Sequence, residues 1–167
     1  GEFVVLHGLM PATLTLYNNK GVKMADITKA TVNTLSLSPN GQFLLAGGFG
    51  NIGSGLIEIY SVPTLIQQYI TKKKRQDDED EDEQVKKDGE TPGLIGRCYN
   101  PWGVSISWAA DSSLFSSAVC TPRLLVDNHF DIFSPHTATR LTGCGVETLY
   151  EITFCPALAQ PADATPP

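Results

Sequence analysis

Short β-type segments that recur at a nearly constant interval constrain the fold of this chain more than any other feature. Each segment is rich in β-branched and apolar residues and runs into a tight turn, which is typical of strands in all-β proteins. Three segments have this form: residues 32–37 before SPNG, residues 104–108 before AADS, and residues 150–154 before CPA. Gly and Pro, with 15 and 11 residues, suit the many turns that such a protein needs.

The spacing of these turns predicts a β-propeller. Pro39 and Ala110 are 71 residues apart, or 48 without the 23 residues of a charged segment at 71–93. Ala110 and Pro156 are 46 residues apart. Both intervals are close to the ~40–45 residues of a WD40-type blade. Residues 56–61, LIEIYS, and 129–134, HFDIFS, repeat one pattern as third strands, with an acid between apolar neighbours.

We therefore predict an all-β fold: a partial WD40-like β-propeller with about two full blades and partial blades at either end. Residues 3–6 and 13–17 are expected to be the last strands of an incoming blade, and residues 140–142 the outer strand of the second full blade. A closed propeller needs at least about four blades, which indicates a piece of a longer propeller or a divergent remnant. A β-sandwich has similar short strands and is not excluded by periodicity.

The domain organisation follows from a sharp change in composition. Residues 72–90 hold six basic and nine acidic side chains, and such like-charged blocks stay solvated. The prediction is propeller blades at 1–70, a disordered charged insertion at 71–93, further blades at 94–157, and a disordered Pro/Ala-rich tail at 158–167.

The stretch GGFGNIGSG, residues 47–55, contains the G-x-G-x-x-G spacing of a dinucleotide-binding loop. That loop must follow a strand and open a helix, whose N-terminal N–H groups bind the phosphates. Here the downstream residues 56–62 have strand chemistry, and Pro63 disfavours continuation as a helix. We predict a β-hairpin in which the glycines supply tight backbone geometry.

No set of residues predicts catalysis or metal binding. The four cysteines, Cys98, Cys120, Cys144 and Cys155, form no C-x-x-C pair and are expected to be small buried side chains in a reducing compartment. Asp127, Asn128 and His129 are interpreted as a turn after a strand at 124–126 rather than as metal ligands. We expect no enzyme activity, no cofactor and no metal.

Candidate partner contacts are Arg123, Trp102 and the basic run Lys72, Lys73, Lys74 and Arg75. Arg123 follows a proline at a strand connection, where it fits a phosphate or an acidic partner and equally a structural pair with Asp111 or Asp127. Trp102 is a loop aromatic of the kind that anchors interfaces, whereas Trp108, in an alternating strand, is expected in the core.

Charge and hydropathy limit the partners. With a net charge of −6, the chain lacks the strongly basic surface that non-specific nucleic-acid binding requires. The neighbouring acids also screen the basic residues 72–75. No run approaches the ~18 apolar residues of a membrane span.

Three motifs in order resemble the eukaryotic translation initiation factor 2A family. They are Gly8 with Met10-Pro11-Ala12 and Leu16-Tyr17-Asn18, then SPNGQFLLAGGFGN at 38–51 with Ile57-Glu58-Ile59-Tyr60, then Thr121-Pro122-Arg123-Leu124 leading to Asp127-Asn128. The basic residue that this family tends to carry after Met-Pro-Ala is replaced by Thr13, and the earlier blades and C-terminal helical tail have no counterpart here.

The resemblance implies a cytoplasmic, non-catalytic propeller segment that binds the small ribosomal subunit and supports initiator-tRNA recruitment. Initiator tRNA or mRNA, through the full-length protein, and other initiation factors are the further partners it implies. The alternative is a generic WD-repeat-type scaffold for proteins, including the similar propeller of subunit b of initiation factor 3.

Overall fold

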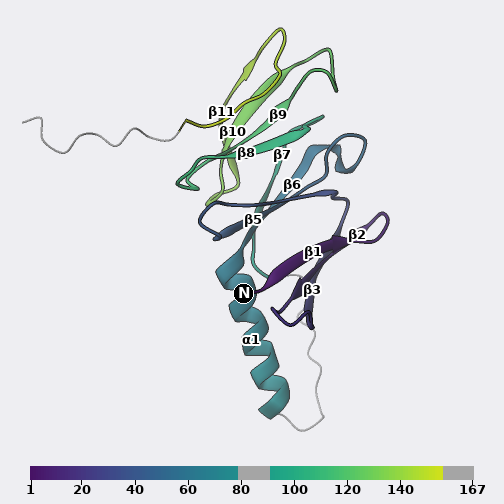
Figure 1. Cartoon of the computed structure of the whole chain (residues 1–167), viewed down its shortest axis with the longest axis vertical. Coiled ribbons are helices and arrows are strands. Elements are labelled where there is room, and N and C mark those ends of the chain that lie inside the picture. The colour runs from purple at the N-terminus through teal and green to yellow at the C-terminus, as the bar shows by residue number, and fades with distance from the viewer. Residues whose placement is uncertain (79–90, 156–167) are drawn as a thin grey trace, which may run out of the picture.

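In a computed structural model, which describes residues 1–78 and 91–155, the strands form three consecutive antiparallel sheets (Figure 1). The first sheet has three strands: β1 (Phe3–His7), β2 (Ala12–Tyr17) and β3 (Lys23–Ala30). The second has four: β4 (Thr34–Leu37), β5 (Phe43–Gly47), β6 (Leu56–Ser61) and β7 (Leu94–Tyr99). The third also has four: β8 (Ser105–Trp108), β9 (Phe115–Val119), β10 (His129–Ser134) and β11 (Thr139–Gly145).

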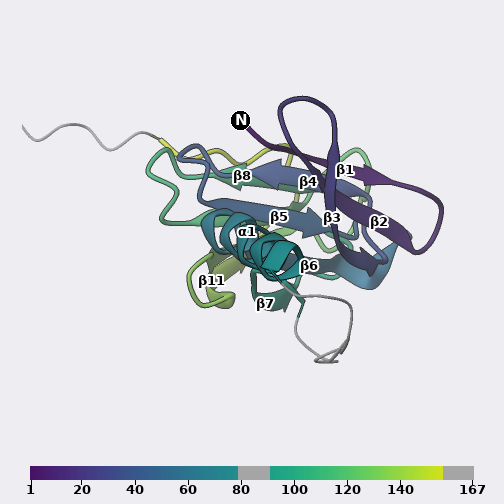
Figure 2. The same cartoon turned by 90° about the horizontal axis from the view of Figure 1, so that it is seen from below.

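Each sheet is a meander in which every strand pairs with its neighbour in sequence. The sheets follow one another through the molecule (Figures 1 and 2), so the middle sheet is covered on both faces. This burial explains why β5, with the sequence FLLAG, is buried throughout instead of alternating between buried and exposed positions. Repeated four-stranded meanders stacked in sequence order are blades, and the partial β-propeller prediction is confirmed over the sandwich.

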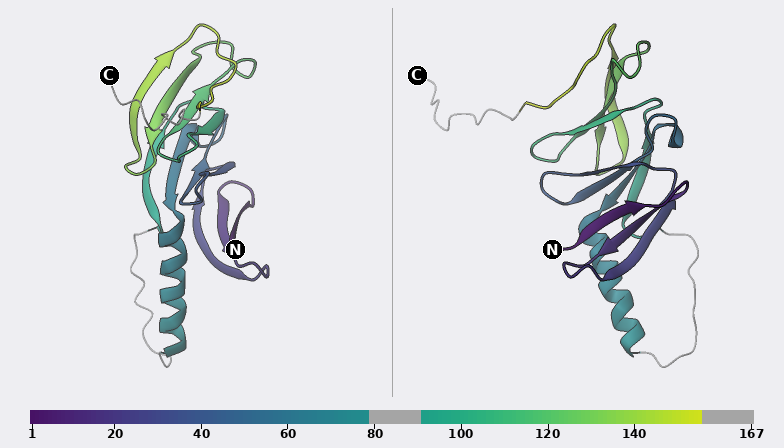
Figure 3. Two further views of the ribbon diagram at one scale, coloured as in Figure 1. Left: turned by 60° about the vertical axis from the view of Figure 1, so that its left-hand side comes forward. Right: turned by 45° about the vertical axis from the view of Figure 1, so that its right-hand side comes forward.

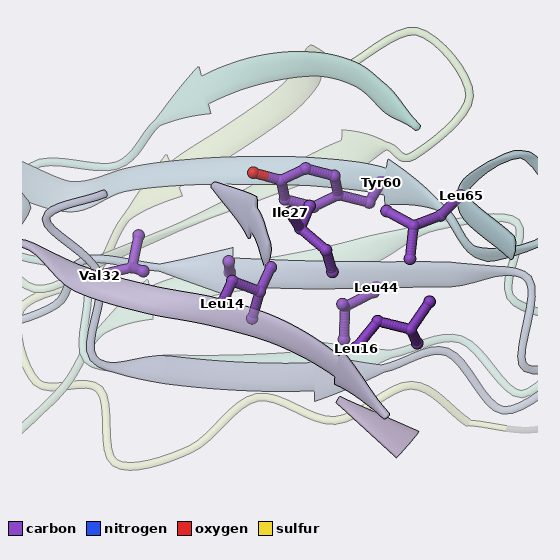
Figure 4. Close-up of a cluster of buried hydrophobic side chains, with 8 residues drawn as sticks. Leu14, Leu16, Ile27, Val32, Leu44, Tyr60 and Leu65 are labelled. Carbon is purple, nitrogen blue, oxygen red and sulfur yellow. The ribbon is translucent and has the colours of Figure 1, made fainter. Parts of the chain in front are cut away.

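Two apolar clusters join the blades. Between the first and second sheets lie Leu14, Leu16, Ile27, Val32, Leu44, Ala46, Tyr60 and Leu65 (Figure 4). Between the second and third sheets lie Phe43, Leu45, Phe49, Ile57, Ile59, Cys98, Phe115 and Phe133. Alternate residues of β5 and β6 contribute to opposite clusters because side chains of a strand point to opposite faces.

Trp108 is half-buried at the rim of the second cluster and was predicted as core. Its ring lies 5.3 Å from the ring centroid of Phe115, and its indole N–H donates to Ser36 Oγ at 3.0 Å. The polar end of the indole therefore joins two inner strands, while Phe115 occupies the fully buried position.

The acid that repeats in the third strands has a structural role. Glu58 of β6 pairs with Arg97 of β7 at 2.8 Å, and Asp131 of β10 pairs with Arg140 of β11 at 2.7 Å. In both pairs the carboxylate is buried and the arginine reaches it from the outer strand. The predicted match between residues 56–61 and 129–134 is confirmed as β6 and β10.

Helix α1 (Val62–Asp78) corrects the predicted start of the disordered insertion. Residues 71–78 continue this helix, and residues 79–90 lie outside the described residues. Pro63 occupies the first turn, where a proline N–H is not needed, and the backbone N–H of Thr64 donates to the Ser61 hydroxyl at 3.3 Å. The apolar spacing of residues 62, 65, 66 and 69 is the helical signal that the prediction missed.

Three other strand predictions differ from the structure. The last strand of the incoming blade is β3, which the sequence analysis missed; residues 124–126 form a loop instead of a strand. Residues 150–154 are not a strand, since no strand of the described residues pairs with them. Residues 140–142 lie in the outer strand β11, as predicted. The tail predicted at 158–167 is outside the described residues.

Candidate partner-binding surface

The connections between the strands gather the candidate residues on one face. In an antiparallel meander, successive connections leave the sheet at alternate ends. The β1–β2, β5–β6 and β9–β10 connections project to the same side, on the right in Figure 1. We call this side the loop face; it comprises residues 8–11, 31–33, 48–55, 100–103, 120–128 and 146–151.

The glycine-rich run is the hairpin connection between β5 and β6, as predicted. After a single short 3₁₀ turn, Gly53–Gly55, the chain enters β6. A Cβ at Gly48 or Gly53 would overlap the Thr31 carbonyl oxygen, and one at Gly55 would overlap the Asn100 carbonyl. The glycines therefore allow neighbouring loops to approach the hairpin backbone closely.

We expect Gly48→Ala to lower the free energy of unfolding by about 2 kcal/mol, because a methyl group must displace the backbone of residue 31. Urea denaturation followed by circular dichroism measures this loss. Gly145→Ala is the matched control, since a Cβ there meets nothing within 4 Å. Equal stability of the two variants would contradict the packing role of Gly48.

Arg123 lies on the loop face with its guanidinium next to Gly50. Its side chain is exposed, and the three ion pairs of the described residues do not include it. Pairing with Asp111 or Asp127 is therefore not observed. Asp111 instead accepts hydrogen bonds from the backbone and side chain of Ser113, which lower the pKa of its carboxyl.

A cleft of about 340 Å³ opens beside Arg123. The cleft is lined by residues 104–107, most of which belong to β8, by residues 120–123 and by residues 150–152. Arg123, Glu151 and the hydroxyl of Ser105 give this cleft mixed charge and polarity. It can hold a small polar group of a partner, and both charge signs are represented.

Trp102 also lies on the loop face, in the turn between β7 and β8. Its side chain is 56% exposed, and its backbone φ is +66°, a value uncommon for residues other than glycine. The turn is closed by a hydrogen bond from Gly103 N–H to the Asn100 carbonyl at 3.0 Å. The structure thus brings Arg123 and Trp102 to one face.

Lys72, Lys73, Lys74 and Arg75 lie elsewhere, in the C-terminal half of α1. The helix begins at the opposite ends of the strands, because β6 runs from the loop face to Ser61. Figure 3 shows α1 extending away from the sheets. The candidate contacts therefore divide into two separate regions.

Three asparagines that the sequence analysis did not single out hold the loop face together. Asn33 donates to the Phe49 carbonyl at 2.9 Å and accepts from the Phe49 N–H at 3.0 Å. Asn100, fully buried, bonds Ser117 at 3.1 Å and His129 at 2.8 Å. Each lies in a loop between strands, where an isolated Asn in the sequence suggests only a turn.

The third of these asparagines, Asn128, is almost fully buried. Its amide donates to the Leu124 carbonyl at 2.8 Å, and its side-chain oxygen accepts from Thr121 at 2.8 Å and from the Leu149 N–H at 2.9 Å. One side chain thus joins the β9–β10 connection to the segment after β11. Residues 127 and 128 belong to this connection, and His129 is the first residue of β10.

The histidines and cysteines have structural surroundings. His7 contacts the Thr15 hydroxyl at 2.9 Å, and His136 packs edge-on against Phe43. No group of metal-ligating side chains occurs within residues 1–78 and 91–155. Cys98 and Cys120 are buried as predicted, and burial raises the pKa of the Cys98 thiol to about 12. Cys144 and Cys155 are exposed, which corrects the prediction that all four are buried.

None of the described helices is long and apolar enough to span a membrane.

The antiparallel meanders, stacked in sequence order, define the class of the chain as a partial β-propeller. Residues 1–78 match the family model of "Eukaryotic translation initiation factor eIF2A". The chain is 33% identical over 127 residues to eukaryotic translation initiation factor 2A of Dictyostelium discoideum, which covers 76% of this chain and 16% of that protein. Identity to the Caenorhabditis elegans protein is 30% over 129 residues, covering 77% and 18%.

A crystal structure of a eukaryotic initiation factor has the same fold, with a TM-score of 0.68 and 25% identity. The alignment covers 90% of this chain and 30% of that one. The chain therefore belongs to the eukaryotic translation initiation factor 2A family. It spans less than a fifth of the length of the two curated relatives described above.

Proposed function

We propose that this chain is a non-catalytic β-propeller segment of a cytoplasmic translation initiation factor that binds the small ribosomal subunit. Through the full-length protein it supports recruitment of initiator tRNA, with mRNA and other initiation factors as further partners. Family membership supports the role in initiation. The observation that carries subunit binding is the position of Lys72, Lys73, Lys74 and Arg75 on the projecting part of α1.

The first half of α1 is attached to the blades. Leu65 is 3% exposed in the cluster between the first two sheets, and the Gln68 side chain accepts from the Gly93 N–H at 3.0 Å. Ile70 is already 47% exposed. The 17 residues of α1 give a length of roughly 25 Å at 1.5 Å per residue, so the second half carries residues 72–75 away from the sheets.

A basic helix held away from an acidic body is suited to RNA phosphates. Lysine and arginine in the last turns of a helix are also favoured by its dipole. The acidic run DDEDEDE that follows at 77–83 weakens attraction at long range, so contact is expected to be local and dependent on salt. Ribosomal RNA is a partner of this kind.

Sedimentation through a sucrose gradient of cell extract tests the proposal. We expect the tagged protein to migrate with small ribosomal subunits, and the K72A/K73A/K74A/R75A variant to lose at least about ten-fold in affinity at 150 mM salt, since four phosphate contacts are removed. The matched control is K72R/K73R/K74R, which retains all four charges and should migrate normally.

Two outcomes would overturn parts of this proposal. Slow migration of the unaltered protein, away from ribosomes, would remove the ribosomal role. Normal migration of the quadruple alanine variant would leave subunit binding intact and transfer it to another surface. A generic protein scaffold is the second candidate function, and the exposed apolar side chains of the loop face favour it.

A further inference from the structure

The loop face carries the most exposed large apolar side chains of the described residues. Every such side chain that is more than 60% exposed lies there: Leu9 at 93%, Met10 at 65%, Leu125 at 76%, Val126 at 65% and Tyr150 at 72%. Trp102, at 56%, lies on the same face. Exposed apolar side chains scattered singly are ordinary, whereas Leu9 and Met10 are neighbours in one loop and Leu125 and Val126 in another, and such groups on one face favour an interaction surface.

The charges of this face argue against a nucleic acid. The loop face contains one basic residue, Arg123, and three acidic residues, Asp127, Glu147 and Glu151. RNA phosphates require a surplus of lysine and arginine to release counterions. Leucine, methionine and valine also offer no platform on which bases stack, a role that belongs to aromatic and arginine side chains.

The same face is held in a defined shape. The hydrogen bonds of Asn33, Asn100 and Asn128 join the loops of successive blades and the segment after β11. Loops fixed before binding lose little conformational entropy when a partner docks. A tied loop that nevertheless exposes Leu125 and Val126 is stable without covering them, because its polar backbone groups are satisfied within the loop.

We propose that the loop face is a docking surface for a protein whose contact surface combines apolar and basic side chains. Leu9, Met10, Trp102, Leu125 and Val126 supply the apolar contacts, and Asp127, Glu147 and Glu151 attract the basic side chains. Arg123, whose guanidinium lies beside Gly50, is available to pair with an acidic group of the same partner. This surface is separate from residues 72–75, so the inference does not depend on the proposed ribosomal RNA contact.

Site-specific photocrosslinking in a translation-active cell extract tests this surface. The full chain carries p-benzoylphenylalanine in place of Leu125 or, separately, of Leu9; the control carries it in place of Leu141, which is 56% exposed on the outer strand β11. We expect both loop-face probes, and not the control, to crosslink to the same protein. Nuclease treatment should leave the adduct unchanged, and mass spectrometry should place the crosslink next to lysine or arginine residues.

A second variant keeps the test independent of the probe. D127K/E147K, which reverses two exposed charges of the loop face, should lower the yield of the Leu125 crosslink at least five-fold, whereas D111K, on the opposite face, should not. Adducts that nuclease removes, or none from either probe, would overturn the inference even if the protein migrates with ribosomes. A protein adduct without comigration would support this surface and count against the proposed function.

Discussion

Replacing Phe115 with alanine is expected to lower the free energy of unfolding by roughly 3–5 kcal/mol. Phe115 is fully buried in the cluster that joins the second and third sheets. Its ring stacks on Phe133 with centroids 5.2 Å apart and lies 5.3 Å from Trp108. Alanine would leave a cavity that β-sheets on both sides cannot close, because each is held by its own hydrogen-bonded strands.

Urea denaturation monitored by circular dichroism and by tryptophan fluorescence measures this change. Trp108 contacts the altered site and reports local loosening, whereas Trp102 is remote from it on the exposed turn. Phe130→Ala is the matched control: Phe130 is half-buried on β10 and lies outside the cluster. A loss below about 1 kcal/mol for Phe115→Ala would show that the blades do not depend on this cluster.

Replacing Glu58 with alanine should have the second largest effect, a loss of about 2–3 kcal/mol. Glu58 is 2% exposed and accepts from Arg97 Nε at 2.8 Å and from the Tyr60 hydroxyl at 2.7 Å. Removing the carboxylate leaves the buried Tyr60 hydroxyl without this acceptor, which costs the desolvation of that group. Arg97 is about half exposed, so its charge stays hydrated and the cost remains below that of a fully buried broken pair.

The protonated state of the Tyr60 hydroxyl supports the role of Glu58 as its hydrogen-bond acceptor. Burial, together with the hydrogen bond to Glu58, raises the pKa of the Tyr60 phenol, which stays a neutral donor. The stabilisation of the folded state by this neutral phenol is fully present below the pKa of an unfolded tyrosine, near 10. It is lost as the pH rises further. Removing Glu58 takes away only the hydrogen-bond part of this contribution, because Tyr60 is still buried in the variant.

Lys23→Ala provides the control for Glu58. Lys23 and Asp26 also form an ion pair at 2.8 Å, but both side chains are about half exposed. Exposed pairs contribute about 0–1 kcal/mol, so this variant should unfold almost as the unaltered protein does. If both variants lost a similar free energy of unfolding, the burial of Glu58 would not be the reason that its ion pair stabilises the fold.

The recurrence of strands was readable from the sequence because a blade repeats its own pattern. The acid of LIEIYS and HFDIFS was visible as a repeat, and the two strands it belongs to are β6 and β10. Its purpose was not visible, since the arginine partners lie 39 residues away for Glu58 and nine for Asp131. Only the pairing of strands brings these groups within hydrogen-bond distance.

The sequence-based predictions are wrong where local and tertiary signals compete. Residues 71–93 were predicted as disordered because of their charge. Residues 71–78 instead extend helix α1, which Ser61 caps and which packs against the first apolar cluster through Leu65. Residues 150–154 have strand composition but no strand beside them, and composition alone supplies no hydrogen-bond partner. Trp108 alternates like a core residue and yet lies at a rim, since burial depends on the neighbouring sheet.

The sequence by itself determined the all-β class, the hairpin nature of the glycine run and the family, because each rests on patterns of local chemistry along the chain. The tertiary structure decided that Arg123 and Trp102 share a face with Leu9 and Leu125, while residues 72–75 lie apart on α1. The physical reason is connectivity: an antiparallel meander returns alternate loops to one side. Side chains more than a hundred residues apart in sequence thereby come to lie on one face.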